Sequence, residues 1–257
     1  MDLGLAGKIG LVTGGSRGIG RATALRLAHE GVDVAICGRT AETLETTLSE
    51  LRATGVRAHG VIADVTAAGE AERFVDESAA QLGGVDLVIA NVGGSAGRGL
   101  LESTPEDWLQ TFEQNLFHAV RSIRAAVPHM QARGGGSAVS IASISGWKPG
   151  PTAQYGAAKA GEIFLAGALA WELASSRIRV NTVSPGSIIF PGGGWARFRE
   201  RDADRFAEFE RREFPWGRLG TAEEVADVVV FVLSQRASWI NGANIAVDGA
   251  QGRPSAF

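Results

Sequence analysis

The sequence has a single cysteine and no long apolar run, and each shortage excludes a class of protein. Cys37 is the only cysteine among 257 residues, so no internal disulfide can form and we expect a reducing, cytoplasmic compartment. Its neighbours Val34, Ala35 and Ile36 are apolar, which predicts a packed core thiol. The first eight residues lack the basic-then-apolar order of a signal peptide, and no stretch is apolar over the length of a bilayer. We therefore expect no membrane partner.

Neither sign of charge is in large excess. Lys and Arg number 25 and Asp and Glu number 28, for a formal net charge of -3. No basic stripe with interleaved aromatic residues is present, so we expect no nucleic-acid partner. The hydrophobic share of 45% supports a large core, and the length fits one large α/β domain or two small ones. The absence of a linker or repeat favours one domain over residues 1–257.

Short apolar runs alternate with helix-like stretches along the chain. This order predicts right-handed crossovers and a buried parallel sheet with helices on both faces. Seven strands make a doubly wound α/β sheet of the Rossmann type, in the order 3-2-1-4-5-6-7, which binds its ligand at the carboxyl ends of the strands. The expected strands cover residues 9–12, 32–37, 58–62, 87–90, 138–142, 179–183 and 245–247, and the expected helices include 41–53, 68–82, 105–124, 152–175 and 222–234.

A glycine-rich turn joins the first expected strand to the first helical pattern. Its sequence is Thr13-Gly14-Gly15-Ser16-Arg17-Gly18-Ile19-Gly20. Glycines let backbone approach a phosphate closely, and the N-terminus of the following helix offers free N–H groups and a positive dipole end. The Gly-x-x-x-Gly-x-Gly spacing differs from the Gly-x-Gly-x-x-Gly fingerprint. A plain glycine-rich connector is the alternative, and the strand–turn–helix context favours a dinucleotide site.

Tyr155 and Lys159 lie four residues apart, one turn from each other on one face of a helix. A nearby ammonium stabilises a phenolate, and a tyrosine tuned in this way can give or take a proton as a general acid or base. The pair alone is weak, because many surface helices carry it by chance. Together with Ser143, a dozen residues upstream, and the glycine-rich turn, the pair favours a catalytic site.

The region from Gly186 to Arg218 interrupts the alternation of strands and helices. It begins with a stretch rich in Pro and Gly, residues 191–194, and continues with a highly charged segment that carries Phe at intervals. A long insertion after the carboxyl end of a strand suits an element that covers a substrate. We therefore expect a substrate lid over residues 187–218. A solvated amphipathic helix packed on the body or on another subunit is the alternative.

With these motifs in order, the chain resembles the short-chain dehydrogenase/reductase family over essentially its whole length. The glycine turn matches the nucleotide turn of that family, and Ser143, Tyr155 and Lys159 match its active-site Ser, Tyr and Lys. Further matches are Asp64-Val65 after the third strand, Asn91 and Gly93 at the end of the fourth, Asn115 on the next helix, Pro185-Gly186 after the sixth strand and Asp248-Gly249 after the last. The resemblance implies that the cofactor is bound by Gly14, Ser16, Arg17, Gly18, Ile19, Gly20, Arg39, Asp64, Val65, Asn91, Gly93, Tyr155, Lys159, Pro185, Gly186 and Ile188.

The chain departs from the family pattern at two strand ends. Ala90 stands where the first Asn of the fourth-strand motif is usual and Val92 where Ala is usual, whereas Asn91, the second Asn, is kept. Ser187-Ile188 follows the sixth-strand motif, where a Thr often contacts the carboxamide of the nicotinamide. That contact is expected from the backbone or from Ser187. None of these changes removes a proton-transfer group.

The resemblance implies hydride transfer between a nicotinamide cofactor and a carbonyl compound or alcohol, without a metal. Tyr155 protonates the carbonyl oxygen, and Ser143 hydrogen-bonds the same oxygen. Lys159 supports the phenolate and holds the nicotinamide ribose, while Asn115 anchors a water that links Lys159 to solvent. Alternatives for single residues are a strand-end cap for Ser143 and a helix-interior amide for Asn115.

The end of the second strand decides the expected nicotinamide. An NAD site has an acid there for the ribose 2′-OH, but Gly38 holds this position and Asp33 lies too early in the strand. Arg39 comes next and Arg17 lies in the glycine turn, and two guanidiniums suit a 2′-phosphate. We therefore expect NADP(H), with NAD(H) as the alternative. A surface ion pair with Glu42 is the alternative for Arg39.

The substrate is the least determined feature. We expect Trp147 and Trp195 beside its entrance with Ser95 nearby, which favours an apolar or aromatic small-molecule carbonyl compound. A ketone reductase or a 3-oxoacyl-acyl-carrier-protein reductase fits the pattern, and an NAD-dependent secondary-alcohol or sugar-alcohol dehydrogenase is the alternative. A catalytically silent NADP-binding sensor is disfavoured because Ser, Tyr and Lys are all kept. A nucleotide-sugar epimerase is disfavoured because no large C-terminal domain follows.

The expected helix over residues 152–175 is rich in small residues, which suit close packing across a two-fold axis. The family resemblance implies a homotetramer. Packing of the same face against the sheet of its own chain is the alternative.

Overall fold

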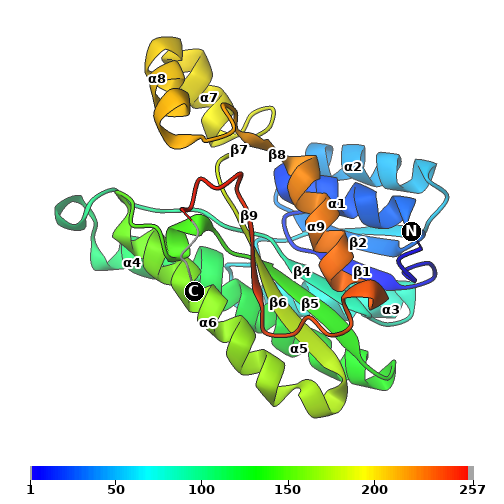
Figure 1. Cartoon of the computed structure of the whole chain (residues 1–257). Coiled ribbons are helices and arrows are strands. Elements are labelled where there is room, and N and C mark those ends of the chain that lie inside the picture. The colour runs from blue at the N-terminus through cyan, green and yellow to red at the C-terminus, as the bar shows by residue number, and fades with distance from the viewer. Residues whose placement is uncertain (1, 254–257) are drawn as a thin grey trace.

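Seven short strands form one parallel sheet in the computed structural model, which describes residues 2–253 (Figure 1). The strand order is β3-β2-β1-β4-β5-β6-β9, and every neighbouring pair is parallel. The bounds are Ile9–Val12 for β1, Asp33–Gly38 for β2, Ala58–Ile62 for β3, Leu87–Ala90 for β4, Gly136–Ile141 for β5, Ile178–Pro185 for β6 and Asn244–Val247 for β9. Since β9 is the seventh strand of this sheet in chain order, the predicted fold class and strand order are confirmed.

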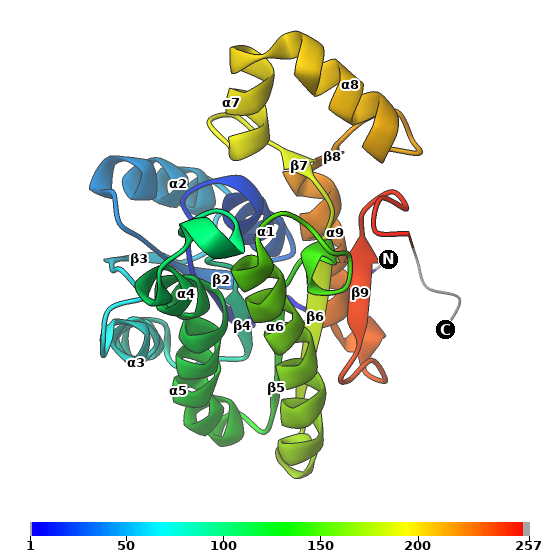
Figure 2. The ribbon, with the colours of Figure 1, turned by 90° about the vertical axis from the view of Figure 1, so that its left-hand side faces the viewer.

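Helices cover both faces of the sheet (Figure 2). On one face lie α1, α2 and α9, and on the other lie α3, α5 and α6. The bounds are Gly18–His29 for α1, Ala41–Ala53 for α2, Glu70–Leu82 for α3, Pro105–Phe112 for α4, His118–Ala132 for α5, Ala153–Glu172 for α6 and Ala222–Leu233 for α9. Short 3₁₀ turns follow at Leu100–Glu102, Ile144–Gly146, Ala174–Ser176 and Gln235–Ala237.

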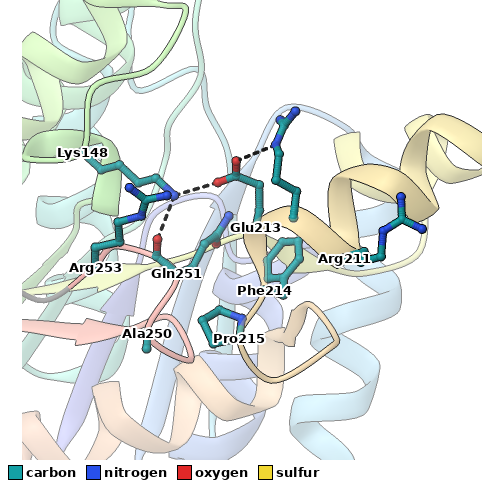
Figure 3. A pocket seen from close by; sticks show the side chains of 9 residues that line it. Lys148, Arg211, Glu213, Phe214, Pro215, Ala250, Gln251 and Arg253 are labelled. Carbon is teal, nitrogen blue, oxygen red and sulfur yellow. Dashed lines mark hydrogen bonds and ion pairs between the residues drawn. The ribbon is translucent and has the colours of Figure 1, made fainter.

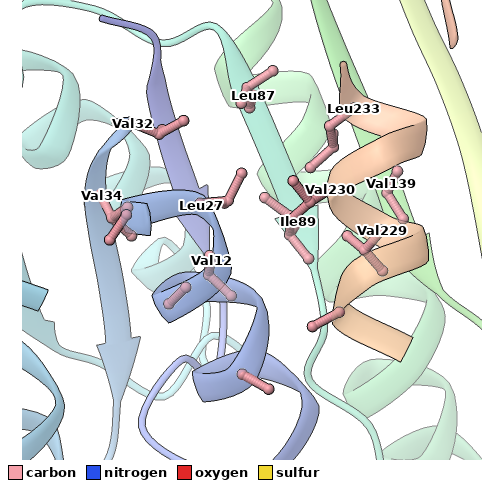
Figure 4. Close-up of a cluster of buried hydrophobic side chains, with 14 of the residues drawn as sticks. Val12, Leu27, Val32, Val34, Leu87, Ile89, Val139, Val229, Val230 and Leu233 are labelled. Atoms are coloured by element: carbon pink, nitrogen blue, oxygen red, sulfur yellow. The ribbon is translucent and has the colours of Figure 1, made fainter. Parts of the chain in front are cut away.

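The apolar side chains of these layers meet in a buried core. Leu27 of α1 and Val229 of α9 pack on Val12 and Ile89 of the sheet, and all four are fully buried (Figure 4). Burying a side chain of this size contributes about 1.5–3 kcal/mol. The continuous apolar runs that predicted the strands are therefore the residues that hold the layers together.

The helix expected over residues 105–124 is interrupted. It consists of α4, a π-helical turn η2 (Glu113–Phe117) and α5. Thr104 and Asp107 form a capping box that begins α4, with Pro105 at its first position. A π turn inserts one extra residue into the helix, which sequence periodicity does not reveal. The inserted turn carries Asn115.

Residues 187–218 contain structure that the sequence pattern did not show. Two helices, α7 (Gly194–Arg201) and α8 (Ala203–Glu213), stand above the body between the two-residue strands β7 (Ile188–Ile189) and β8 (Gly220–Thr221), which pair in parallel (Figures 1 and 2). Their apolar side chains form a separate small core with Phe206, Phe214 and Leu219 buried. The segment is thus a packed unit beyond the carboxyl end of β6.

Three further features bear on what the sequence suggests: the single cysteine, the helices and the metal-ligating side chains. Cys37 is 1% exposed, and burial raises the pKa of its thiol to about 12, so it is an inert core residue as expected. Across residues 2–253, none of the helices has the length and apolarity needed to cross a membrane. That stretch likewise holds no cluster of His, Cys, Asp and Glu suited to a metal ion.

Candidate active site

The glycine turn lies at the carboxyl ends of β1 and β4. Gly14 and Gly18 have positive φ angles of 64° and 54°, which favour glycine. Asn91, just after β4, donates its side-chain amide to the carbonyls of Thr13 at 3.0 Å and Gly14 at 3.2 Å. Gly20 lies so close that a Cβ there would be 2.3 Å from the Gly14 oxygen. Asn91 therefore supports the turn.

The N-terminus of α1 is suited to an anionic group. Arg17 occupies the N-cap without a side-chain hydrogen bond to the helix, and the first turn contains no acidic residue. The free N–H groups and the positive end of the helix dipole favour a phosphate there. The turn and this helix end thus fit the diphosphate of a dinucleotide.

The end of β2 presents Arg39 towards Asp64 instead of Glu42. Arg39 Nη1 lies 3.8 Å from Asp64 Oδ2, and the Arg39 side chain is 71% exposed. Thr66 hydrogen bonds and this guanidinium lower the pKa of Asp64 despite the opposing effect of burial. The surface ion pair predicted as the alternative for Arg39 therefore forms with a different residue. Arg39 and Asp64 meet where strand order brings β2 beside β3.

Tyr155 and Lys159 lie together on α6, which contacts the 3₁₀ turn that follows Ser143. Lys159 Nζ is 5.7 Å from the centroid of the Tyr155 ring. Ser143 follows β5, and its Oγ accepts a hydrogen bond from the Ser145 N–H at 3.1 Å. The hydroxyl of Ser143 thus caps the 3₁₀ turn at Ile144–Gly146. A cap and a contact to substrate oxygen are compatible, because a hydroxyl has one donor and two acceptor sites.

Lys159 is held by an acid that the sequence reading missed. Its ammonium donates to the Ile141 carbonyl at 2.7 Å and to Glu162 at 3.1 Å and 3.3 Å. Burial raises the pKa of the Glu162 carboxyl to about 7, and Lys159 and the Ser140 hydroxyl act in the opposite direction. Glu162 lies three residues after Lys159, and that helical spacing was the only signal in the sequence.

Asn115 is fully buried in the π turn, beside Lys159. Its amide nitrogen donates to the carbonyls of Thr111 at 2.6 Å and Gly94 at 2.7 Å, and its oxygen accepts from the Gly94 N–H at 3.3 Å. A Cβ on Gly93 would lie 3.0 Å from Asn115 Oδ1 and 3.3 Å from Lys159 Nζ. The structure therefore brings Asn115, Gly93 and Lys159 into one cluster.

Ser187, just after the end of β6, is hydrogen-bonded to the C-terminal turn. The Ser187 N–H donates to Gln251 Oε1 at 2.7 Å, and Gln251 Nε2 donates to the Ser187 hydroxyl at 3.0 Å. Ser187 is 7% exposed, so its side chain faces the C-terminal turn. Gly186 accordingly approaches Gln251 and Asp248 with no room for a Cβ. The hydroxyl of Ser187 still has a hydrogen to donate, so a contact to a carboxamide from Ser187 or from the backbone stays a prediction.

The three residues expected beside the substrate have different surroundings. Ser95 is exposed in the loop after β4. Trp147 is 36% exposed and donates its indole N–H to the Gly252 carbonyl at 3.2 Å. Trp195 stacks on Phe209 in the α7–α8 unit with ring centroids 4.8 Å apart. Trp195 therefore packs within that unit, and its part in substrate binding stays a prediction.

Lys148 ties three segments together next to Trp147. Its ammonium lies 2.8 Å from Glu213 Oε2 at the end of α8 and 2.8 Å from the Gln251 carbonyl (Figure 3). The three residues line a pocket of about 240 Å³. The loop between Ser143 and Tyr155 is thus bound to both the α7–α8 unit and the C-terminal turn.

Comparisons with known proteins find relatives over nearly the whole chain. A family model described as enoyl-(acyl carrier protein) reductase matches residues 14–250. The 3-oxoacyl-[acyl-carrier-protein] reductase FabG of Staphylococcus aureus is 34% identical over 244 residues, which cover 94% of this chain and 97% of FabG. The structure of L-sorbose reductase from Gluconobacter frateurii, complexed with NADPH and L-sorbose, covers 99% of this chain and 100% of its own, with a TM-score of 0.94 at 30% identity. A 7α-hydroxysteroid dehydrogenase complexed with NADH and 7-oxo glycochenodeoxycholic acid has a TM-score of 0.89 at 26% identity, covering 96% of this chain and 95% of its own.

Proposed function

Since this chain belongs to the short-chain dehydrogenase/reductase family and is an NAD(P)-dependent oxidoreductase, we propose that it is an NADP(H)-dependent carbonyl reductase. In this proposal Tyr155 is the proton donor. One observation carries the proposal. Lys159 Nζ lies 5.7 Å from the centroid of the Tyr155 ring on α6, and α6 packs against the 3₁₀ turn that Ser143 begins. A phenol supported by a cation and a neighbouring hydroxyl can protonate and hydrogen-bond the same oxygen.

The cofactor supplies the hydride when it is bound, and the protein supplies orientation and the proton. Tyr155 gives its proton to the carbonyl oxygen while Ser143 hydrogen-bonds that oxygen. Lys159 stabilises the resulting phenolate and holds the ribose, and Asn115 anchors the water through which a proton returns. The residues proposed to hold the cofactor are Gly14, Ser16, Arg17, Gly18, Ile19, Gly20, Arg39, Asp64, Val65, Asn91, Gly93, Pro185, Gly186 and Ile188.

The preference for NADP(H) is supported by the two exposed guanidiniums at the adenine end of the site. Arg17 caps α1 and Arg39 follows β2, where an NAD site would hold an acid. Asp64 pairs with Arg39 and neutralises part of its charge. The guanidinium of Arg17 is therefore needed as a second positive group to bind a 2′-phosphate. NAD(H) is the alternative, and the two structural relatives described above bound NADPH in one case and NADH in the other.

For the substrate we propose a ketone or a 3-oxoacyl compound. The 3-oxoacyl reductase relative supports this class. Ser95 and Trp147 are the proposed contacts to the substrate. The α7–α8 unit over residues 187–218 is the proposed lid, which brings Trp195 near the substrate. The alternative is an NAD-dependent secondary-alcohol or sugar-alcohol dehydrogenase, which the hydroxysteroid dehydrogenase relative complexed with NADH supports. A single buried thiol supports a reducing, cytoplasmic setting for either reaction.

We also propose a homotetramer. Large apolar side chains stand exposed on α4 and α6: Leu109 is 58%, Phe164 is 79% and Trp171 is 90% exposed. An exposed apolar face of this kind is typical of a subunit interface. Light scattering after size exclusion should give four chains per particle, and a monomer at micromolar concentration would contradict the assembly.

The reaction is tested by following the absorbance of reduced cofactor with NADPH and with NADH against ketones, 3-oxoacyl thioesters, keto sugars and aldehydes. Replacing Tyr155 by Phe should lower turnover by about 10²–10⁴-fold, because the proton donor is lost. The Kd for NADPH, measured by fluorescence, should change little. Turnover by Tyr155→Phe near the wild-type rate would remove Tyr155 from this role. Tight NADPH binding without turnover of any compound in wild type would favour the silent-sensor alternative.

A further inference from the structure

A buried carboxylate holds the ammonium of Lys159, and the roles proposed above do not use it. The Lys159 and Glu162 side chains are 2% and 1% exposed, and Nζ and Oε1 lie 3.1 Å apart. Ser140 on β5 donates its hydroxyl to Glu162 Oε2 at 3.1 Å. Lys159 also donates to the Ile141 carbonyl at 2.7 Å. The Ile141 carbonyl thus holds the ammonium, the Ser140 hydroxyl holds the carboxylate, and the ion pair joins the two.

A buried ammonium without an anion tends to lose its proton. Burial in a medium of low dielectric constant disfavours the charged form, and removing one partner of a buried pair leaves the other charge uncompensated. The Ile141 carbonyl is a neutral acceptor and offsets only part of this cost. Glu162 is therefore the group that makes a charged Lys159 compatible with its burial.

We propose that Glu162 is a positioning residue for proton transfer at Tyr155, which keeps the Lys159 ammonium charged and fixes it at the end of β5. Glu162 acts through Lys159, whose ammonium lies 5.7 Å from the Tyr155 ring centroid. An opposite charge at such a distance stabilises a phenolate. The inference rests on the proposed function and adds to it the residue that sustains the cation on which that function depends.

The other titratable group close to this cluster does not compete for the proton. His118 on α5 is fully buried, and burial together with the charges of Lys159 and Arg121 lowers its pKa to about 3. His118 is therefore neutral over the range in which a phenol ionises. Arg121 is itself paired with Glu113 at 2.7 Å. The charge that reaches Tyr155 from this side is that of Lys159 together with Glu162.

Glu162 also repels a phenolate directly, and the two effects have opposite signs. Glu162 lies seven residues from Tyr155, two turns along α6, whereas Lys159 lies one turn away. Coulomb interaction weakens with distance, so support of the near cation outweighs repulsion by the farther anion. Loss of the carboxylate should therefore make the phenol harder to ionise.

The test uses the fact that Tyr155 is the only tyrosine of the chain. The ultraviolet difference spectrum of tyrosinate, followed against pH on the purified full chain, reports the ionisation of that one phenol without cofactor or substrate. Replacing Glu162 by Gln should raise the midpoint of this titration by about one pH unit, towards the midpoint of Lys159→Met. Glu172→Gln, at an exposed acid on the same helix, is the matched control and should leave the midpoint unchanged.

Two further variants show whether Glu162 acts through Lys159. Glu162→Asp keeps the charge with a shorter reach and should produce a smaller rise than Glu162→Gln. In the Lys159→Met background, Glu162→Gln should raise the midpoint no further, because the cation it sustains is absent. An unchanged or lowered midpoint in both Glu162 variants, with circular dichroism showing a folded chain, would overturn the proposal. An equal rise in the Lys159→Met background would also overturn it.

Failure of this inference is distinguishable from failure of the proposed function. A shifted titration together with a Tyr155→Phe enzyme of wild-type turnover would refute the catalytic role of Tyr155 and keep the link between Glu162 and Lys159. An unshifted titration in an enzyme that requires Tyr155 would refute the inference alone. In the active enzyme, the alkaline limb of kcat in the alcohol-oxidising direction should move with the titration midpoint.

Discussion

Gly20 is the position at which one added methyl group should cost most in the cofactor site. A Cβ there would lie 2.3 Å from the Gly14 oxygen, a backbone atom, and 2.5 Å from Asn91 Nδ2, which two hydrogen bonds hold in place. Relieving this overlap must displace both the Gly14 carbonyl and the side chain of Asn91. That movement breaks its hydrogen bonds to the Thr13 and Gly14 carbonyls.

The opposing effects of Gly20→Ala can be weighed. Overpacking costs about 1–3 kcal/mol, and losing two hydrogen bonds costs about 1 kcal/mol each. Gly20 lies in the first turn of α1, so Ala returns up to about 1 kcal/mol of helix propensity. The net loss is about 2–4 kcal/mol in the free energy of unfolding. Displacement of the turn should also weaken NADPH binding by at least tenfold.

Urea denaturation measures the first effect, and energy transfer from tryptophan to NADPH measures the second. The midpoint should fall while the denaturant slope stays constant, because the surface exposed on unfolding is unchanged. Gly194→Ala is the control: Gly194 is the first residue of α7, and a Cβ there meets no atom within 4 Å. A Gly20→Ala protein that matches wild type in unfolding free energy and in NADPH affinity would refute the steric argument.

Four other substitutions test charged or titratable groups that the structure places. Burial lowers the pKa of His118 from 6.5 to about 3. Below pH 6.5 the unfolded chain therefore binds a proton that the folded chain does not. The stability contributed by this residue is lost as pH falls from 6.5 towards 3. His118→Leu should therefore flatten the decline of Tm between pH 6.5 and about 4, and equal slopes in both proteins would contradict this. Lys148→Met and Glu213→Gln each remove the ion pair between these two residues. Each should speed tryptic cleavage within α7 and α8 with little change in Tm. Cleavage at the wild-type rate in both variants would show that this ion pair does not restrain the α7–α8 unit. Arg39→Asp should lower the affinity for NADPH relative to NADH by about 10–100-fold, since a charge-assisted contact to phosphate is worth about 1.5–3 kcal/mol, and an unchanged ratio of the two Kd values would exclude Arg39 from the phosphate site.

Local patterns in the sequence were enough to predict the sheet and the position of the site. The runs at 9–12 and 87–90 are apolar throughout because both faces of a parallel strand are buried, and such runs are legible without knowing their partners. The glycine turn and the spacing of Tyr155 and Lys159 are also local, since a turn conformation and a shared helix face depend on neighbouring residues alone. The order of these motifs then placed them at one edge of the sheet.

Only the tertiary structure decided which polar groups meet. The pairing of Arg39 with Asp64 joins the ends of two adjacent strands, and the capture of Ser187 by Gln251 spans 64 residues. Neither has a local signal, because any exposed charge or amide in these loops could serve equally well until the strands fix their distances. Glu162 shows the same limit at short range. Its spacing from Lys159 was visible in the sequence, but its burial depends on β5 lying against α6, and burial is what changes a surface ion pair into a fixed part of the site.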